Sequence, residues 1–187
     1  MCQPSSVSKR LKTTMRLVQD FPKPEISFVD IMPVFQDPKL VNDICCEIVE
    51  LIRAKLPPDV KLNAIVGLEA RGFLFGPMVA VSLNVPFVPI RKRGKLPGNT
   101  VTVAYAKEYG EDYIEIQADA LSAGNNVVIL DDLLATGGTA IAANLLLRKC
   151  NANIPLTLFI VELTYLPGGR LLKNQSIDYC SLVQLDH

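Results

Sequence analysis

Charge imbalance, metal-type cysteine spacing and long apolar runs are all missing from this sequence. Its 19 basic and 19 acidic side chains cancel, which argues against binding to nucleic acid or to a membrane surface through overall charge. The five cysteines have no C-x-x-C spacing, so neither a disulfide framework nor a zinc site is supported. No apolar run approaches the length of a transmembrane helix, and the N-terminus has no signal-peptide core, so we expect a cytoplasmic protein without a membrane anchor.

The order of apolar and polar segments indicates an α/β fold with a mostly parallel central sheet flanked by helices. Neither internal repeats nor Pro/Gly-rich linkers interrupt the 187 residues, so we expect a single domain. Short apolar runs predict strands over Ala64–Gly67, Val85–Ile90, Val127–Leu130, Pro155–Leu163 and Tyr179–Leu185. Helical spacing and proline stops predict helices over Lys9–Gln19, Pro38 to about Lys55, Gly72–Leu83 and Gly138 to about Cys150.

Between these elements, Thr100–Ala106 and Tyr113–Gln117 alternate in the manner of strands around a polar tip. This pattern predicts a hairpin that projects from the core and is a candidate lid. In parallel α/β sheets, ligands bind at the carboxyl ends of the strands. The loops that follow the predicted strands are therefore the first places to look for function.

The segment V-V-I-L-D-D-L-L-A-T-G-G-T, Val127 to Thr139, is the most informative of these. We expect the buried strand to end at Asp131-Asp132 and a helix to follow the Gly-Gly turn. Free amides at a helix N-terminus, glycines that admit a ligand and two threonine hydroxyls form a phosphate cradle, here Ala135, Thr136, Gly137, Gly138 and Thr139. The lysine of a G-x-x-x-x-G-K-[ST] loop is absent, which favours a terminal monophosphate over a triphosphate.

Asp131 and Asp132 stand next to this cradle although carboxylates repel phosphate. Carboxylates in such a position accept hydrogen bonds from sugar hydroxyls, or hold Mg²⁺ directly or through water. A phosphorylated sugar therefore accounts for both the cradle and the acidic pair. The plainer alternative is a capped helix start with two exposed acids, which leaves the T-G-G-T loop unexplained.

A second loop, G-L-E-A-R-G from Gly67 to Gly72, also follows a predicted strand and precedes a predicted helix. Its amides are suited to a further anionic group, and Arg71 is placed to reach a ligand that lies over the sheet. The alternative is a capped turn with a surface ion pair, and the pattern alone does not separate the two.

The third loop is cationic, with Arg91, Lys92, Arg93 and Lys95 directly after the strand that ends at Ile90. Four cations within five residues of a neutral protein form a local anion site, suited to a diphosphate that also binds magnesium. A solvated basic turn is the alternative, although the position at the carboxyl end of a strand favours a ligand site. Together the three loops indicate a ligand with a sugar, a phosphate and a diphosphate.

The same motifs resemble those of a known family. V-V-I-L-D-D-L-L-A-T-G-G-T resembles the phosphoribosyl-pyrophosphate (PRPP) motif of type I phosphoribosyltransferases. The segments G-L-E-A-R-G-F-L-F-G-P, I-R-K-R-G-K-L-P-G and Y-A-K-E-Y-G resemble its adenine-specific members, and the likeness runs from about Phe21 to the C-terminus. The resemblance implies Mg²⁺-dependent transfer of 5-phosphoribosyl from PRPP to N9 of adenine, giving AMP and pyrophosphate for purine salvage in a homodimer. It also implies the family fold, with an N-terminal helix and base-binding hood over about 1–36, a core over about 37–187 and a flexible catalytic loop over about 98–117.

For the donor, the resemblance implies a role for each matching position. Ala135, Thr136, Gly137, Gly138 and Thr139 would hold the 5-phosphate, and Asp131 and Asp132 would face the ribose hydroxyls, with Mg²⁺ bound through PRPP and water and no direct metal ligand assigned. The positions associated with pyrophosphate are Arg71, Arg91, Lys92 and Lys95, the last reaching from the neighbouring subunit in some members.

For the base and the chemistry, Phe28 matches the aromatic residue that stacks on adenine, between the backbone groups of Ser27 and Val29. Glu108, beside Tyr109 on the mobile loop, matches the residue that handles the N9 proton, and Tyr109 matches a donor-binding position. Arg71 and Lys95 are implied as catalytic with Glu108, because cations stabilise the departing diphosphate.

At Val29 the sequence departs from the family, whose members commonly carry an arginine there that would pair with Glu69. A transferase for 6-oxopurines and a non-catalytic PRPP-sensing regulator remain the alternatives. The E-Y-G and G-L-E-A-R-G-F segments favour the adenine enzyme over the first. The neutral charge, and the lack of a helix-turn-helix pattern in the roughly 60 residues before the first predicted strand of the core, argue against the second.

Overall fold

The computed structural model describes residues 6–25, 27–107 and 110–186. Within them, a seven-stranded sheet has the order β5-β6-β4-β3-β7-β8-β9. From β4 to β9 all neighbours are parallel, whereas β6 runs antiparallel to β4 and to β5. The strands span Ala64–Leu68 (β3), Phe87–Lys92 (β4), Thr100–Lys107 (β5), Gly110–Gln117 (β6), Asn126–Leu134 (β7), Asn153–Leu163 (β8) and Tyr179–Leu185 (β9). The predicted α/β fold with a mostly parallel sheet is confirmed.

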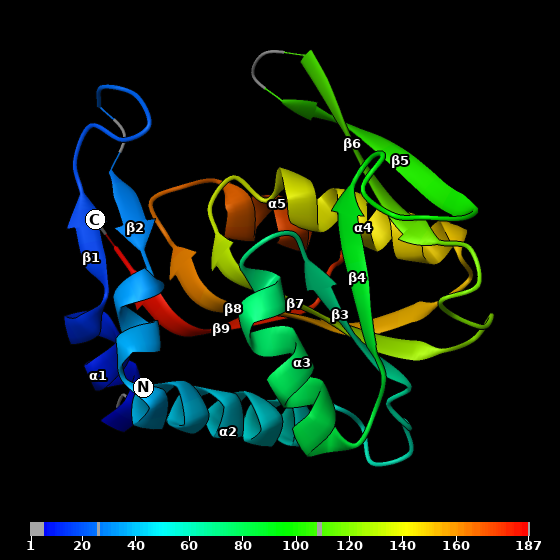
Figure 1. Cartoon of the computed structure of the whole chain (residues 1–187), viewed down its shortest axis with the longest axis horizontal. Coiled ribbons are helices and arrows are strands. Elements are labelled where there is room, and N and C mark those ends of the chain that lie inside the picture. The colour runs from blue at the N-terminus through cyan, green and yellow to red at the C-terminus, as the bar shows by residue number, and fades with distance from the viewer. Residues whose placement is uncertain (1–5, 26, 108–109, 187) are drawn as a thin grey trace.

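Helices cover both faces of this sheet (Figure 1). Alternating residues of β7 show how the faces divide: Val128 and Leu130 pack in one cluster with α2 and α3, and Val127 and Ile129 pack in another with α4. A smaller cluster joins Phe159 of β8 to α4 and α5. The helices span Ser6–Thr14 (α1), Pro38–Lys55 (α2), Gly72–Leu83 (α3), Gly138–Lys149 (α4) and Gly168–Asn174 (α5), with a 3-10 turn η1 at Met32–Gln36.

The predicted helix over Pro38–Lys55 is confirmed with the expected cap. The side chain of Asp37 accepts a hydrogen bond of 3.0 Å from the backbone N–H of Leu40. Pro38 occupies the first turn, where a backbone N–H has no partner within the helix, so the N–H that proline lacks is not needed. The helix ends before Pro57-Pro58, as proline requires. The helices over Gly72–Leu83 and from Gly138 are confirmed as well, whereas the sequence analysis missed α5 and η1.

The predicted helix over Lys9–Gln19 is wrong in its second half. Helix α1 ends at Thr14, and Arg16–Val18 forms a strand, β1, that pairs antiparallel with β2, Phe28–Asp30. Leu17 of β1 lies opposite Val29 of β2. Pairing with a distant segment therefore overrides local helical spacing here, next to two β-branched threonines that favour helix weakly.

Strand β7 is longer than predicted. It does not end at Asp131-Asp132 but continues to Leu134, because β8 runs beside it, with Asp131 opposite Phe159 and Leu134 opposite Glu162. Strand β4 likewise begins at Phe87 rather than Val85 and extends to Lys92, so the first two cations of the third loop lie on the strand itself.

The predicted hairpin is confirmed as β5 and β6, which project from one end of the sheet (Figure 1). Its strands are longer than expected and pair as far as Lys107 with Gly110, while residues 108–109 lie outside the described residues. Across the described ranges, no helix is both long and apolar enough to cross a membrane.

Candidate active site

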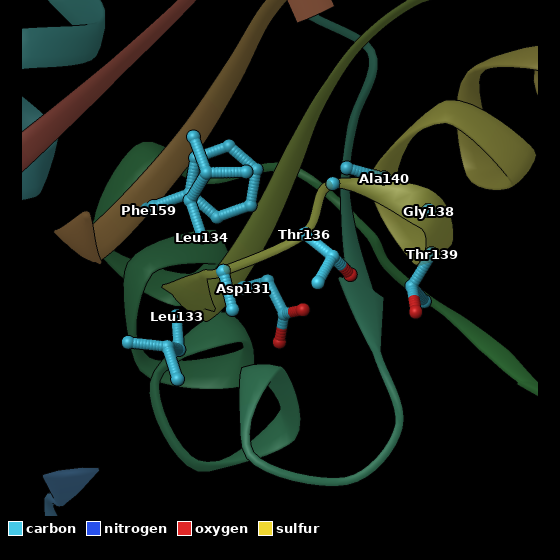
Figure 2. A pocket seen from close by; sticks show the side chains of 10 residues that line it. Asp131, Leu133, Leu134, Thr136, Gly138, Thr139, Ala140 and Phe159 are labelled. Atoms are coloured by element: carbon cyan, nitrogen blue, oxygen red, sulfur yellow. The ribbon is translucent and has the colours of Figure 1, made fainter. Parts of the chain in front are cut away.

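The T-G-G-T loop, where the sequence predicts a phosphate cradle, connects the end of β7 to the start of α4. Gly137 has a φ of +83°, a left-handed conformation that favours glycine, and α4 begins at the next residue, so its first amides point out of the helix start. A small cavity of about 90 Å³ lies here, lined in part by Asp131, Thr136 and Thr139. Figure 2 shows these three side chains along one side of the loop and Leu134 with Phe159 on the other.

The two aspartates lie on β7 rather than after it. Asp132 is 5% exposed, and its Oδ2 lies 2.9 Å from Nε of Arg71. Oδ1 of Asp131 accepts a hydrogen bond of 3.0 Å from the backbone N–H of Asp132. Burial and the neighbouring charge of Asp132 raise the pKa of Asp131 well above its usual range. The site therefore holds two carboxylates where desolvation favours a partner that donates hydrogen bonds.

The second loop lies directly beside this acidic pair. A methyl group added to Gly72, the first residue of α3, would lie 2.6 Å from the carbonyl oxygen of Leu130 and 3.2 Å from Oδ1 of Asp131. Arg71 precedes Gly72 and connects two predicted subsites, because it binds Asp132 and also lies over the ring of Phe28, 5.2 Å from its centroid. The structure therefore brings together three residues predicted for pyrophosphate, ribose and base.

Phe28 lies on β2 and is half-buried. Its ring meets that of Phe21 edge-on at 5.2 Å, so two aromatic residues lie near the guanidinium of Arg71. The neighbouring side chains point elsewhere: the hydroxyl of Ser27 donates to Oε1 of Gln19 at 2.6 Å, and Val29 is 4% exposed in the core. The side chains of Ser27 and Val29 are therefore engaged away from the Phe28 ring, and the predicted base contact falls to their backbone groups.

The cationic loop is held by carboxylates of the protein. Nη2 of Arg91 donates to Oε1 of Glu69 at 2.8 Å, and the backbone N–H of Lys92 donates to Oε2 at 2.9 Å. Glu69 therefore pairs with Arg91 in the absence of an arginine at position 29. The Arg91 guanidinium holds the pKa of Glu69 below its usual value. Nε of Arg91 is buried without a hydrogen-bond partner, which marks it as a donor available to an anion.

A cavity of about 220 Å³ joins the cationic loop to the cradle. Glu69, Arg91 and Lys92 line one side, and Tyr105 of β5 and Thr139 of α4 line the other. Tyr105 lies on the hairpin close to Gly138, and no sequence motif marked it as a site residue. Lys95, in contrast, does not line this cavity, and its side chain is exposed beyond the end of β4.

Glu115 of β6 is a second residue that the sequence analysis missed. It is 3% exposed and accepts hydrogen bonds from the backbone N–H groups of Lys95 and Leu96 at 3.0 and 2.9 Å and from the Thr100 hydroxyl. Burial by itself raises the pKa of Glu115, but these bonds together hold it below the usual value. Its place between Ile114 and Ile116 predicts a solvent-facing side chain, so no local signal identifies it as the residue that shapes the cationic loop.

Two predicted residues, Glu108 and Tyr109, lie outside the described residues. Among the residues that are described, no group of three or more His, Cys, Asp or Glu side chains gathers as a metal site. Asp131 and Asp132 supply two adjacent oxygen donors, and Mg²⁺ is commonly bound by one or two carboxylates together with substrate phosphates and water. The donor set therefore fits Mg²⁺ brought in by a phosphorylated ligand.

Comparison with known proteins shows the family of this chain. Residues 38–177 match the family model of the phosphoribosyl transferase domain. The adenine phosphoribosyltransferase of Caenorhabditis elegans is 45% identical over 180 residues, which cover 96% of this chain and 95% of that protein. The crystal structure of the Saccharomyces cerevisiae adenine phosphoribosyltransferase, complexed with adenine and an imino-altritol bisphosphate, matches with a TM-score of 0.87 at 43% identity over 95% of this chain and 98% of that one. The crystal structure of the Trypanosoma brucei adenine phosphoribosyltransferase, in complex with AMP, pyrophosphate and ribose-5-phosphate, matches with a TM-score of 0.86. Its identity is 28%, and the match covers 98% of this chain and 81% of that one.

Proposed function

We propose a residue-level mechanism for this chain, which belongs to the adenine phosphoribosyltransferase family and is a pentosyltransferase that converts adenine and PRPP to AMP and pyrophosphate in purine salvage. One observation carries the proposal. Strand β7 brings an acidic pair and an anion cradle to the sheet edge where Arg71 and Arg91 also lie. Such an edge recognises the phosphate, ribose and diphosphate of one donor molecule.

The donor binds across the three loops. The amides and hydroxyls of Ala135–Thr139 hold the 5-phosphate, and Asp131 and Asp132 accept hydrogen bonds from the ribose hydroxyls. Arg71, Arg91 and Lys92 bind the pyrophosphate, and the buried, unpartnered Nε of Arg91 supports this role. Lys95 lies on the same loop but is exposed, which fits a contact made to the pyrophosphate of a neighbouring subunit.

Adenine binds in the hood formed by α1, β1 and β2. The ring of Phe28 stacks on the base, and the backbone of Ser27 and Val29 reads its edge. The burial of Val29 supports this role for the backbone, because an inward-pointing side chain leaves only main-chain groups to face the ligand. The guanidinium of Arg71 then lies between base and donor.

The reaction is a displacement at the anomeric carbon. The bond from C1′ to adenine N9 forms as the bond from C1′ to the pyrophosphate oxygen breaks, and the N9 proton passes to Glu108. Cations at the departing diphosphate lower the activation barrier most. A general base increases the reaction rate by a further factor of roughly 10² to 10⁴. Closure of the β5–β6 hairpin, with Tyr109 against the donor, excludes water and so protects PRPP from hydrolysis.

Mg²⁺ is the expected cofactor, held by PRPP and water near Asp131 and Asp132. When bound, it neutralises charge on the diphosphate and makes it a better leaving group. The chain's own part is to orient the ribose through the acidic pair and to keep the diphosphate against Arg71 and Arg91.

The active form is a homodimer in the cytoplasm. An apolar groove of about 750 Å³ runs between α2 and α3, where Met78 is 39% and Val81 is 81% exposed. Exposed apolar patches of this kind mark interaction surfaces, and a second copy of the chain is the occupant implied by the resemblance. The described cysteines Cys45, Cys46, Cys150 and Cys180 are free thiols, which suits a reducing compartment.

The decisive experiment mixes the protein with PRPP and Mg²⁺, offers adenine, guanine and hypoxanthine separately, and follows nucleotide formation. We expect AMP from adenine and little product from the other two. A preference for hypoxanthine would contradict the base assignment, and no turnover with any base would indicate a PRPP-binding regulator. Light scattering of the wild type and of Val81→Glu tests the dimer, which the charged variant should dissociate.

A further inference from the structure

The back of the phosphate cradle rests on the start of α5, a segment more than 30 residues further along the chain. The backbone N–H of Gly168 donates to the carbonyl oxygen of Ala135 at 3.0 Å. A methyl group added to Gly168 would lie 2.3 Å from this oxygen, and one added to Gly137 would lie 3.1 Å from the Cα of Gly168. The backbones of the cradle and of α5 are therefore in direct contact.

The next residue, Gly169, makes an equally close contact on the other side of α5. A methyl group there would lie 2.3 Å from the hydroxyl of Tyr179 and 2.5 Å from Oε1 of Glu162. Gly168 and Gly169 do not belong to the glycines with positive φ, so their small size rather than their backbone freedom is what these contacts require. The start of α5 therefore packs against the cradle through Gly168 and against the Glu162–Tyr179 pair through Gly169.

Glu162 makes this support rigid. It is 5% exposed, and its carboxylate accepts hydrogen bonds from three side chains of β9, those of Tyr179 (2.9 Å), Ser181 (3.1 Å) and Gln184 (2.9 Å). All three donors are neutral side chains of the same strand, so Glu162 ties β8 to β9 through hydrogen bonds. Beneath it, Leu134 and Phe159 pack with Leu172 of α5 in an apolar cluster that also reaches α4.

We propose that Gly168, Gly169, Glu162 and Tyr179 are positioning residues that hold the cradle in the shape required by the donor's 5-phosphate. They touch neither the donor nor the base, and they act through Ala135 and Gly137. The inference rests on the proposed role of Ala135–Thr139 as the 5-phosphate site. Misplacement of a binding group by about 1 Å can lower activity roughly 100-fold. Small shifts of these four positioning residues are therefore expected to weaken donor binding.

The first test is Gly168→Ala, which forces the Ala135 carbonyl or α5 to move. We expect the KM for PRPP to rise by roughly 10- to 100-fold while the KM for adenine stays unchanged and kcat falls less than the KM rises. Calorimetry with ribose 5-phosphate as the probe should show the same loss of affinity. The matched control is Gly76→Ala, whose methyl group would meet the Phe87 ring, also at 2.3 Å, near the start of β4 and away from the cradle. It should lower the melting temperature but leave the KM for PRPP unchanged.

The second test is a rescue. Gly169→Ala should raise the KM for PRPP, and adding Tyr179→Phe should restore much of the affinity, because it removes the hydroxyl that the new methyl group meets and frees Oε1 of Glu162 to move. Equal KM values for PRPP in folded Gly168→Ala and Gly76→Ala would contradict the positioning role. A Gly169→Ala, Tyr179→Phe double variant with the same KM for PRPP as Gly169→Ala alone would contradict it as well. A wild-type protein that does not bind PRPP would instead refute the proposed function, so the two failures are distinguishable.

Discussion

The phosphate cradle and the cationic side of the site are built by different means. The cradle consists of backbone, with Gly137 in a left-handed conformation and the loop held by the neighbouring start of α5. The cationic side consists of long side chains that bind carboxylates of the same protein, Arg71 with Asp132 and Arg91 with Glu69. One half of the site thus has its shape before the donor arrives, and the other half has its charges already paired.

This difference predicts how each half responds to the donor. A preformed backbone cradle loses little conformational entropy on binding, because its groups are already oriented. The arginines must exchange a carboxylate for the diphosphate, and Asp132 must exchange Arg71 for a ribose hydroxyl. Such exchanges are feasible because the arginine of each ion pair is partly exposed, with the Arg71 and Arg91 side chains at 30% and 32% exposure. The acidic pair is the point where the two halves meet.

The largest effect is therefore expected from Asp131→Asn combined with Asp132→Asn. The double variant replaces both charged ribose acceptors with neutral amides and removes the charge partner of Arg71 at the same time. Hydrogen bonds to charged groups contribute about 1.5–3 kcal/mol each, so affinity for PRPP should fall by roughly 10²- to 10⁴-fold. Calorimetric titration with PRPP and Mg²⁺ measures this, and an unchanged affinity would refute the role of the acidic pair.

The next largest effect is expected outside both halves, at Glu108. Neither the cradle nor the arginines accept the N9 proton, so Glu108→Ala should lower kcat by roughly 100-fold and change donor affinity far less. Steady-state kinetics at saturating PRPP and adenine separates the two parameters. Should kcat remain at the wild-type value, proton transfer must be assigned to another group.

A smaller effect is expected from a single side chain of the cradle. Because backbone amides carry most of the contact, Thr136→Val should weaken PRPP binding only about tenfold or less. Thr164→Val is a matched control, since Thr164 bonds the carbonyl of Leu185 at 3.1 Å on the last strand. A loss as large as that of the acidic-pair variant would show that the cradle depends on side chains after all and would remove the distinction between the halves.

The smallest effect is expected in stability, at Glu115 behind the cationic loop. Its folded-state pKa lies below the usual value of 4.5, so its stabilising contribution is present above pH 4.5 and is lost as the pH falls through the lower folded-state value. Glu115→Gln should lower the free energy of unfolding at pH 7 by about 1 kcal/mol and flatten its dependence on pH below 4.5. Denaturant unfolding between pH 7 and pH 3 measures both, and parallel curves for the two proteins would contradict the assignment.

The local sequence predicts helices, strands and turns correctly wherever one contiguous segment determines the structure. Proline stops, an aspartate cap and apolar spacing place α2 correctly, and the T-G-G-T loop marks the start of α4 because a helix N-terminus and its glycines are contiguous in sequence. The local prediction is wrong where pairing with a distant segment determines the structure. Arg16–Val18 becomes a strand only because Phe28–Asp30 lies beside it, and β7 passes the acidic pair only because β8 continues alongside.

The amino-acid order alone determined which chemical groups this protein presents near the carboxyl ends of its strands: a T-G-G-T loop, an acidic pair and a run of cations. Tertiary structure alone decided which of these groups meet one another. Arg71 lies between Asp132 and Phe28, Glu115 holds the loop that contains Lys95, and Gly168 stands behind Ala135. These partners are between 20 and 61 positions apart, counted as 115 − 95 and 132 − 71. No local periodicity encodes such contacts, because they exist only once the parallel sheet has brought the carboxyl ends of its strands to one edge.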